Sequence, residues 1–365
     1  MSTIFVLDKY LNFLGEVDDF QSLIFSSVWN KSASFHIRIS KNSRNVELLR
    51  SGFFISIERD ARKVGIINHQ ETTQNQEYWD IKGMHINSLM SQRLTVPPAG
   101  HGYDRITGNC ENIMQHYVET NFINPSDPNR KIELLELAPS LNRGSKASWE
   151  SRYKYVEDEL AELAESSGLR WDLWTDFYRK KIIFQVNETV DRSAMQSNVP
   201  AVIFSPDFDN VEDQTFVNSK VNHRNFGYIA GQGEDAARRI VGIGSVSGIE
   251  RKELFVDARD IENDDELPSR GAVKMAEYNP ILTFETKIIN GRNSNTIFNH
   301  DWFIGDIVTS QNRDWGITIN NRVTEVKEIY SDNKYIIEPT FGPSIPTQFD
   351  IIRKQFKQLS SLIRK

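Results

Sequence analysis

The sequence predicts a mixed α+β fold that is mainly β, with two small antiparallel β-barrel-like domains and an α/β insert made of a helix plus a hairpin. Three observations predict this fold class. Residues 302–342 contain short β-branched and aromatic runs with roughly period-2 alternation, separated by Asn, Asp, Ser and Gly. Residues 52–83 show a similar order of runs and breaks. Residues 148–186 carry a helical pattern followed by two alternating runs.

Residues 302–342 are expected to form an antiparallel meander. The strand-like runs are divided by polar breaks at 312–314, 320–321 and 331–333. The alternation predicts one buried face, and the side chains expected on the other face are Glu325, Lys327 and Glu328. A meander of this size cannot bury both faces alone, so it requires a partner sheet or closure into a small barrel.

Residues 52–83 and 305–342 share one order of features: a glycine, an apolar strand, a charged turn, a Gly-Ile strand, a polar turn, an aromatic strand and a glycine. This order indicates an internal duplication. The loop lengths differ and few residues are identical, so chance similarity between two β-meanders is the alternative reading.

Length and composition bound the class of protein. A chain of 365 residues is long enough for two or three domains, and 39% hydrophobic with 25% charged residues is typical of a globular protein. A net charge of −7 argues against a general nucleic-acid binder. Cys110 is the single cysteine, which excludes an internal disulfide framework. The sequence shows no signal-peptide pattern and no membrane span, so we expect synthesis and folding in the cytosol.

Residues 1–96 are expected to form the first barrel-like domain. An opening strand, an alternating strand and the first meander alternate with short turns, and the last element before the boundary reads as a helix or a strand. These segments are 4–7, 35–39, 45–50 (a short helical turn), 52–83 and 86–94. The paired prolines and glycines of residues 96–102 suit neither a helix nor a central strand and set the boundary.

Residues 97–198 are expected to form the α/β insert. Asn109 is placed to cap a first helix, and Ser148 is expected to open a second helix that ends at Gly168. A hairpin follows, with its turn near Asp176. The acidic residues on the second helix are read as a solvated face.

Three further segments complete the prediction. A β-rich middle domain is expected over 199–294, a second barrel-like meander over 295–345 and an amphipathic basic helix over 346–365. In the middle domain, strands are expected at 201–204, 217–221, 226–230, 239–249 and 254–258, and a short helix at 271–278.

Chemical motifs give no catalytic, cofactor-binding or metal site. Residues 231–236 match Gly-x-Gly-x-x-Ala, but no β-α-β unit surrounds them and Glu234 and Asp235 would oppose a phosphate, so a tight acidic turn between strands is predicted. Residues 242–248 lack the spacing of a nucleophile elbow. The seven histidines show no i, i+3 or i, i+4 pair. We therefore predict that the protein is not an enzyme.

Several soft motifs occur in an order that resembles the tail-hub proteins of long-tailed phages, the siphophage family named after ReqiPepy, which is related to myophage baseplate hubs. They are found at residues 15–18, 34–39, 45–49, 57–60 with 65–67, 88–94 before 97–100, 230–234 with Arg238, and 304–308 with 316–317. Asp235 stands where the family pattern leads us to expect a further glycine.

The resemblance implies a fold like that of phage tail hubs and a homotrimer at the distal end of the tail tube. Two similar barrels per subunit would present six near-equivalent units to a hexameric tube or ring, which favours duplication over chance similarity. The implied partners are a distal tail or tail-tube protein and a downstream tail-tip or receptor-binding protein, with no nucleic-acid recognition. The implied location is the virion tail, after synthesis in the bacterial host cytoplasm. We expect the helix at 346–365 to pack on its own trimer, with docking of the next tail component as the alternative.

Two other functions remain open. The insert could be a peptidoglycan-hydrolase-type module, although it lacks a Glu/Asp or Cys/His arrangement, and little chain follows the last meander for an added lytic domain. Alternatively, the hairpin could bind a host-surface carbohydrate through its aromatic residues, which are Trp171, Trp174, Phe177 and Tyr178. Alternation predicts that Trp171 lies in the core and that Trp174 is free.

Overall fold

The computed structural model describes residues 2–259, 261, 264–288, 296–331 and 334–342. The chain divides into two compact units: a large unit, Met1–Gln214 with Glu285–Phe341, and a small unit, Thr215–Phe284 with Gly342–Lys365. Strands hold 44% of the residues and helices 18%, which confirms the prediction of a mainly β fold with few helices. The helix predicted at 346–365 lies outside the described residues.

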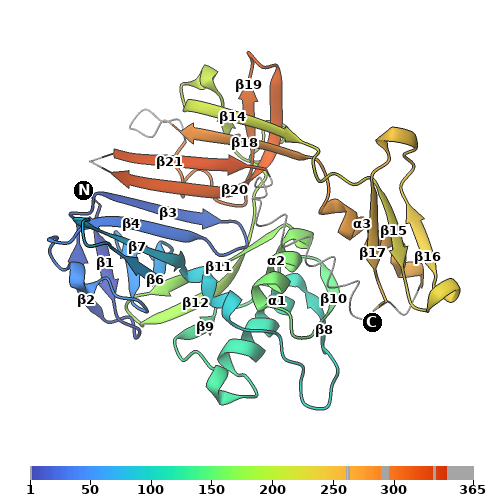
Figure 1. Cartoon of the computed structure of the whole chain (residues 1–365), viewed down its shortest axis with the longest axis horizontal. Coiled ribbons are helices and arrows are strands. Elements are labelled where there is room, and N and C mark those ends of the chain that lie inside the picture. The colour runs from blue at the N-terminus through green and yellow to red at the C-terminus, as the bar shows by residue number, and fades with distance from the viewer. Residues whose placement is uncertain (1, 260, 262–263, 289–295, 332–333, 343–365) are drawn as a thin grey trace. The chain divides into compact units, whose positions relative to one another are not determined.

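The strands of the N-terminal region form the first half of one antiparallel sheet (Figure 1). In spatial order they are β3 (Ser22–Val28), β4 (Ser34–Ser40), β7 (Tyr78–His85), β6 (Val64–Glu71), β5 (Phe54–Ile57), β1 (Ile4–Leu7) and β2 (Phe13–Val17). Their β-branched and aromatic side chains alternate into a core that includes Ile4, Phe25, Ile37, Ile57 and Ile81. The 3-10 helices η1 (Val46–Leu48) and η2 (Ile86–Gln92) follow β4 and β7 in the chain. The first meander, β5–β6–β7, is therefore confirmed.

The C-terminal strands continue the same sheet. β20 (Ile317–Ser331) pairs with β3. Beyond β20, the sheet continues through β21 (Lys334–Phe341), β18 (Ile281–Ile288) and β14 (Val211–Ser219). Outside this path, β19 (Ile307–Asn312) pairs with β20 and with β13 (Ile203–Phe204). In the part of the chain that the structure describes, the order runs from β14 to β2 without a pairing that closes it. The two regions expected as separate barrel-like domains thus share one large, mainly antiparallel sheet, joined by the β20–β3 pair.

β20 corrects the predicted break at residues 320–321. Asn320 and Asn321 lie inside this 15-residue strand, opposite Thr309 and Val308 of β19. The Thr309 hydroxyl donates a hydrogen bond to Asn320 Oδ1 at 2.7 Å, which satisfies the amide within the sheet. Local composition indicated a turn because Asn is common in turns, but a strand partner supplies the same hydrogen bonds.

Glu328 is a second correction, because it does not share the solvent face with Glu325 and Lys327. Its side chain is 1% exposed and forms an ion pair with Lys63, which lies just before β6. The Tyr330 hydroxyl donates to Glu328 Oε1 at 3.2 Å, and the Tyr335 hydroxyl donates to the same atom. Burial, together with the Glu328 charge, raises the pKa of both tyrosine hydroxyls far above the ordinary value.

The insert packs two helices against a three-stranded sheet. Its elements are β8 (Asp104–Asn109), α1 (Cys110–Val118), η3 (Glu119–Ile123), η4 (Pro128–Arg130), β9 (Leu135–Leu137), β10 (Lys146–Ser151), α2 (Val156–Ser167), β11 (Leu169–Asp176) and β12 (Lys181–Glu188). The hairpin β11–β12 and the helix start at Asn109 are confirmed, and Gly168 ends α2 with φ 70°. The insert shares one apolar core with Leu7, Leu11 and Phe54 of the N-terminal strands.

Ser148 does not open a helix. It lies in β10, and its hydroxyl is 2.9 Å from that of Thr107 on the paired strand β8. Helix α2 begins later, at Val156. The polar–apolar alternation of β10 is short, so the acidic helical pattern that follows it hid the strand.

The small unit contains a three-stranded sheet with one helix. β15 (Phe226–Ala230) pairs with β16 (Ile240–Ile243) in the antiparallel and with β17 (Glu253–Asp257) in the parallel direction. Helix α3 (Leu267–Ala276) packs on the face that carries Ile229, Leu254 and Val256. A Cβ at Gly271 would lie 2.6 Å from the Ile229 side chain, so only glycine allows this close approach. The short 3-10 helices of the middle region are η5 (Pro206–Phe208), η6 (Asp235–Ala237), η7 (Gly248–Glu250) and η8 (Asp264–Glu266).

Candidate interaction site

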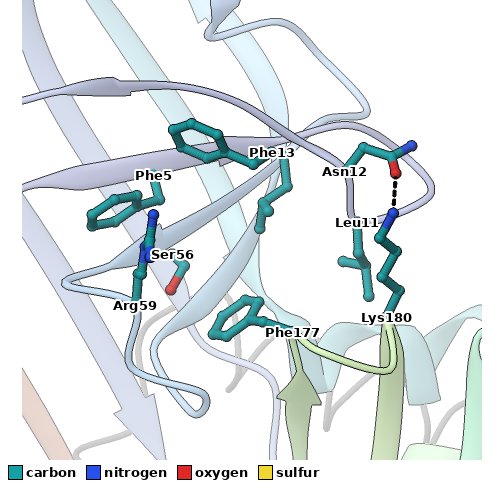
Figure 2. Close-up of a pocket in the computed structure, with 9 residues that line it drawn as sticks. Phe5, Leu11, Asn12, Phe13, Ser56, Arg59, Phe177 and Lys180 are labelled. Carbon is teal, nitrogen blue, oxygen red and sulfur yellow. Dashed lines mark hydrogen bonds between the residues drawn. The ribbon is translucent and has the colours of Figure 1, made fainter.

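A pocket of about 490 Å³ opens in the large unit where three turns meet: the turn between β1 and β2, the turn after β5, and the tip of the hairpin β11–β12 (Figure 2). It is lined by Phe5, Leu7, Leu11, Asn12, Phe13, Ser56, Arg59, Phe177 and Lys180. Sequence reasoning missed this site because its walls come from segments more than 100 residues apart. Phe177 alone among these residues had been singled out.

Each of the three turns contributes a lining residue with a left-handed backbone. The φ angles are 62° at Leu11, 55° at Arg59 and 53° at Lys180. This conformation costs a residue with a Cβ about 1–2 kcal/mol and persists only where the surrounding structure holds it. The hairpin tip is held in part by the Thr175 N–H, which donates to the Ala61 carbonyl at 2.8 Å. The pocket is therefore shaped before any ligand enters.

Asp8 organises the turn between β1 and β2. Its carboxylate accepts hydrogen bonds from the backbone N–H groups of Tyr10 and Asn12, at 2.8 and 2.9 Å, and from the Asn12 side chain at 2.9 Å. Asn12 Oδ1 in turn accepts from Lys180 Nζ at 2.6 Å, which joins this turn to the hairpin (Figure 2). Burial acts to raise the pKa of Asp8, but these hydrogen bonds and the Lys180 charge together lower it below its ordinary value.

The pocket combines aromatic walls with cationic groups. Leu7 and Leu11 are buried behind it, and the Arg59 guanidinium lies 4.6 Å from the ring centroid of Phe5 and 5.7 Å from that of Phe13. Among the nine lining residues, the charged ones are Arg59 and Lys180. Neither forms a direct ion pair with a carboxylate of the described residues. The site therefore offers apolar contact together with two cations: Lys180, which interacts with Asp8 through space and through Asn12, and Arg59, which has no ion pair among the described residues.

Two aromatic walls of the pocket remain accessible. Phe13 is 53% exposed on β2, which is the last strand of the sheet order, and Phe177 is half-buried at the hairpin tip. Near them in the chain, Tyr10 is 57% exposed and Tyr178 is 97% exposed. Exposed apolar side chains that gather on one surface mark interaction sites.

The aromatic hairpin agrees only in part with the carbohydrate hypothesis. Trp171 is in the core as predicted, 1% exposed, with its ring 6.1 Å from that of Phe184. Trp174 is not free: it is half-buried, and its indole nitrogen is shielded from solvent. Burial alternates along the whole of β11 as predicted, but the face that carries Trp174 is half-buried and not free.

A second aromatic surface lies on the outer face of the small unit's sheet, opposite α3. The Arg251 guanidinium is 3.5 Å from the Phe226 ring centroid and donates to the Tyr228 hydroxyl at 2.9 Å. It also pairs with Glu253 at 2.7 Å. The cation on this face is thus already paired with a carboxylate, and its aromatic neighbours already contact the cation.

The predicted acidic turn at residues 231–236 is confirmed as the connection between β15 and β16. Gly233 has φ 107° and Asp235 has φ 48°, so the aspartate adopts the left-handed conformation for which a glycine was expected. The Arg238 side chain closes the turn by donating to the carbonyls of Ala230 and Gly231 and by pairing with an acidic residue of β17.

The described residues contain neither a membrane-spanning helix nor a metal-binding cluster. No helix among them is long and apolar enough to cross a membrane. Their His, Cys, Asp and Glu side chains form no group of three or more that could hold a metal ion.

The fold is similar to that of three tail proteins of known structure. The tail protein from Neisseria meningitidis MC58 matches with a TM-score of 0.60 and 13% identity, covering 94% of this chain and 97% of that one. The 43 kDa tail protein of prophage MuSo2 from Shewanella oneidensis gives 0.59 and 10%, covering 93% and 98%. The prophage tail protein gp18 from Listeria monocytogenes EGD-e gives 0.55 and 14%, covering 99% and 100%.

The family assignment rests on a match of residues 3–343 to the family described as Siphovirus ReqiPepy6 Gp37-like protein. The chain belongs to this family, and the resemblance found in its soft motifs is confirmed. No curated protein matches the sequence.

Proposed function

We propose that this protein is a structural component of a phage tail. It acts as a hub at the distal end of the tail tube, where it links the tube or a distal tail ring to the tip and host-recognition apparatus. The observation that carries the proposal is the match of nearly the whole chain, residues 3–343, to a siphovirus family. Prophage tail proteins that share the fold over 93–99% of this chain support it.

The arrangement of the meanders supports a trimeric ring. β5–β6–β7 and β19–β20–β21 are both three-stranded antiparallel meanders, and both lie in the one sheet of the large unit. As duplicated halves, residues 1–96 and 295–345 would give a homotrimer six related faces. A ring of that kind matches a hexameric tube or distal tail protein on one side and a tip or receptor-binding protein on the other.

The side chains with shifted pKa values support a structural role for the protein and not an enzymatic one. Burial raises the pKa of Tyr117 far above the ordinary value, and its hydroxyl donates to the Asp104 carbonyl at 3.0 Å. Burial lowers the pKa of His85 to about 4, and both ring nitrogens have backbone partners. Groups of this kind hold a core together. The proposed location is the virion tail, after synthesis in the bacterial host cytoplasm, and the proposal includes no nucleic-acid sequence recognition and no membrane span.

A second candidate function is binding of a host-surface carbohydrate at the hairpin tip. It is favoured by the 97% exposure of Tyr178, beside the half-buried Phe177. Tyr178→Ala tests it: loss of adsorption of otherwise assembled virions would favour carbohydrate recognition, and unchanged adsorption would exclude a role for this ring.

The hub function is tested by assembly. Light scattering over a range of concentrations should give the mass of a trimer, and negative-stain images with the tail-tube and distal tail proteins of the same phage should show rings. A protein that stays monomeric at every concentration, with no ring in the presence of both tail proteins, would contradict the proposal.

A further inference from the structure

We propose that the pocket between the β1–β2 turn, the turn after β5 and the hairpin tip receives an apolar side chain and an adjacent carboxylate from a segment of a neighbouring tail protein. The inference rests on the proposed function, because that function supplies a tail protein as the partner. It adds the surface and the chemistry of recognition.

The size and shape of the pocket fit an anchoring side chain. Its volume of about 490 Å³ lies within the range of ligand pockets, about 300–1,000 Å³. Phe5, Phe13 and Phe177 form aromatic walls (Figure 2). Leu7 and Leu11 are the buried residues of the lining. Because left-handed residues in all three turns fix this shape, little conformational entropy is lost on binding.

The charges specify a carboxylate. Arg59 and Lys180 bring two positive charges to the pocket. Lys180 is partly balanced by Asp8, to which Asn12 connects it, whereas Arg59 forms no ion pair within the described residues. The Arg59 guanidinium lies 4.6 Å from the Phe5 ring centroid and 5.7 Å from that of Phe13, and rings accept no hydrogen bond of carboxylate strength, so its N–H donors can still bind a carboxylate. A carboxylate next to the apolar anchor therefore gains charge-assisted hydrogen bonds that a neutral group cannot form.

The surroundings favour a protein segment as the occupant. One wall of the pocket, Phe13, is 53% exposed on β2, the last strand of the sheet order. An occupant that also covers this ring and its strand buries more apolar surface than a small molecule inside the pocket. Aromatic side chains of this kind are typical of protein–protein hot spots. β2 adds an accessible strand at the end of the sheet, where Asn45 already binds the Glu16 carbonyl by a side-chain amide, at 2.9 Å.

The chemistry of the pocket is tested with N-acetyl-phenylalanine and its neutral counterpart N-acetyl-phenylalaninamide, titrated into the full chain and followed by NMR. We expect the carboxylate probe to bind about tenfold more tightly than the amide. Arg59→Gln and Lys180→Gln should each reduce this preference, and Arg44→Gln, an exposed cation outside the pocket, should leave it unchanged. Equal binding of the two probes, or binding of neither, would overturn the assigned chemistry.

The partner is tested by ring assembly with the tail-tube and distal tail proteins of the same phage. Arg59→Gln/Lys180→Gln should keep the mass of the wild type and lose at least tenfold in affinity for a tail protein. Its melting temperature should fall by only a few degrees, because the Lys180–Asn12 hydrogen bond that it loses is exposed. If this variant assembles as well as the wild type, the inference fails and the hub function stands. If it loses its own trimer, the occupant is a second copy of the chain and the partner proposed here is wrong. If the wild type binds the carboxylate probe but forms no ring, the hub function fails.

Discussion

The pocket of the large unit and the outer sheet face of the small unit both combine aromatic rings with arginine, yet they differ in how the charge is balanced. On the sheet face, Arg251 pairs with Glu253 at 2.7 Å and Arg238 with Asp257 at 2.6 Å. In the pocket, Arg59 stacks on two rings without a direct carboxylate partner. An aromatic–arginine composition therefore does not identify a binding site by itself. A cation left unpaired within its own chain is the informative feature.

The largest expected effect on stability comes from breaking the ion pair between Lys63 and Glu328. The Glu328 side chain is 1% exposed, so it is more deeply buried than either carboxylate on the sheet face. Glu328→Ala leaves Lys63 without its partner and two tyrosine hydroxyls without their acceptor. We expect a loss of about 3–5 kcal/mol in the free energy of unfolding, measured by denaturant titration. Glu325 on the same strand is half-buried, and its Oε1 lies 3.8 Å from Lys327 Nζ. Glu325→Ala should therefore lower the free energy of unfolding by less than about 1 kcal/mol. Equal losses would show that burial does not govern the value of these pairs.

His85 is a buried titratable group that has no ion-pair partner among the described residues, in contrast to Glu328. Burial therefore favours its neutral form. Its Nε2 faces the Arg62 carbonyl at 3.0 Å and its Nδ1 accepts from the Asn87 N–H at 3.1 Å, so a second proton has no acceptor. Burial lowers its pKa to about 4 from 6.5. Between these values the unfolded state binds more protons, so stability should rise with pH across this window, by about 3 kcal/mol in total.

The pH prediction is checked by unfolding at a series of pH values with the wild type and with His85→Gln. The variant should lose most of the slope between pH 4 and 6.5. An unchanged slope would assign the dependence to other groups.

Removing one acid from the small unit's face should make it resemble the pocket. Asp257→Asn leaves Arg238, whose side chain is 12% exposed, without its carboxylate. We expect a loss of about 1–3 kcal/mol in stability and a new preference for N-acetyl-phenylalanine over its amide. Glu253→Gln, on the more exposed pair, should cost less than about 1 kcal/mol. A stable Asp257→Asn protein with no probe preference would show that an unpaired arginine on a flat face is insufficient.

The smallest effect is expected at the turn that shapes the pocket. Asp8→Asn weakens the three hydrogen bonds to Tyr10 and Asn12 and should cost about 1 kcal/mol at neutral pH. Because folding lowers the pKa of Asp8, its contribution is present above the unfolded value near 3.8 and is lost as pH falls through the folded value. Stability curves of wild type and variant should therefore converge at low pH. A constant gap at all pH values would contradict this account.

Local patterns in the sequence determined the elements whose partners are close in the chain. The hairpin β11–β12, the meander β5–β6–β7 and the start of α1 at Asn109 follow from alternation, helical spacing and turn residues within a few positions. The order of soft motifs likewise sufficed for the family, since it depends on sequence alone.

The tertiary structure decided everything that depends on distant pairing. Asn320 sits in a strand because β19 satisfies its amide, and Glu328 is buried because Lys63, 265 residues away, neutralises it. The pocket exists because turns at Leu11, Arg59 and Lys180 converge. Alternation reports which side chains are apolar, but the free energy of burying a charge or amide depends on a partner that only the folded chain supplies.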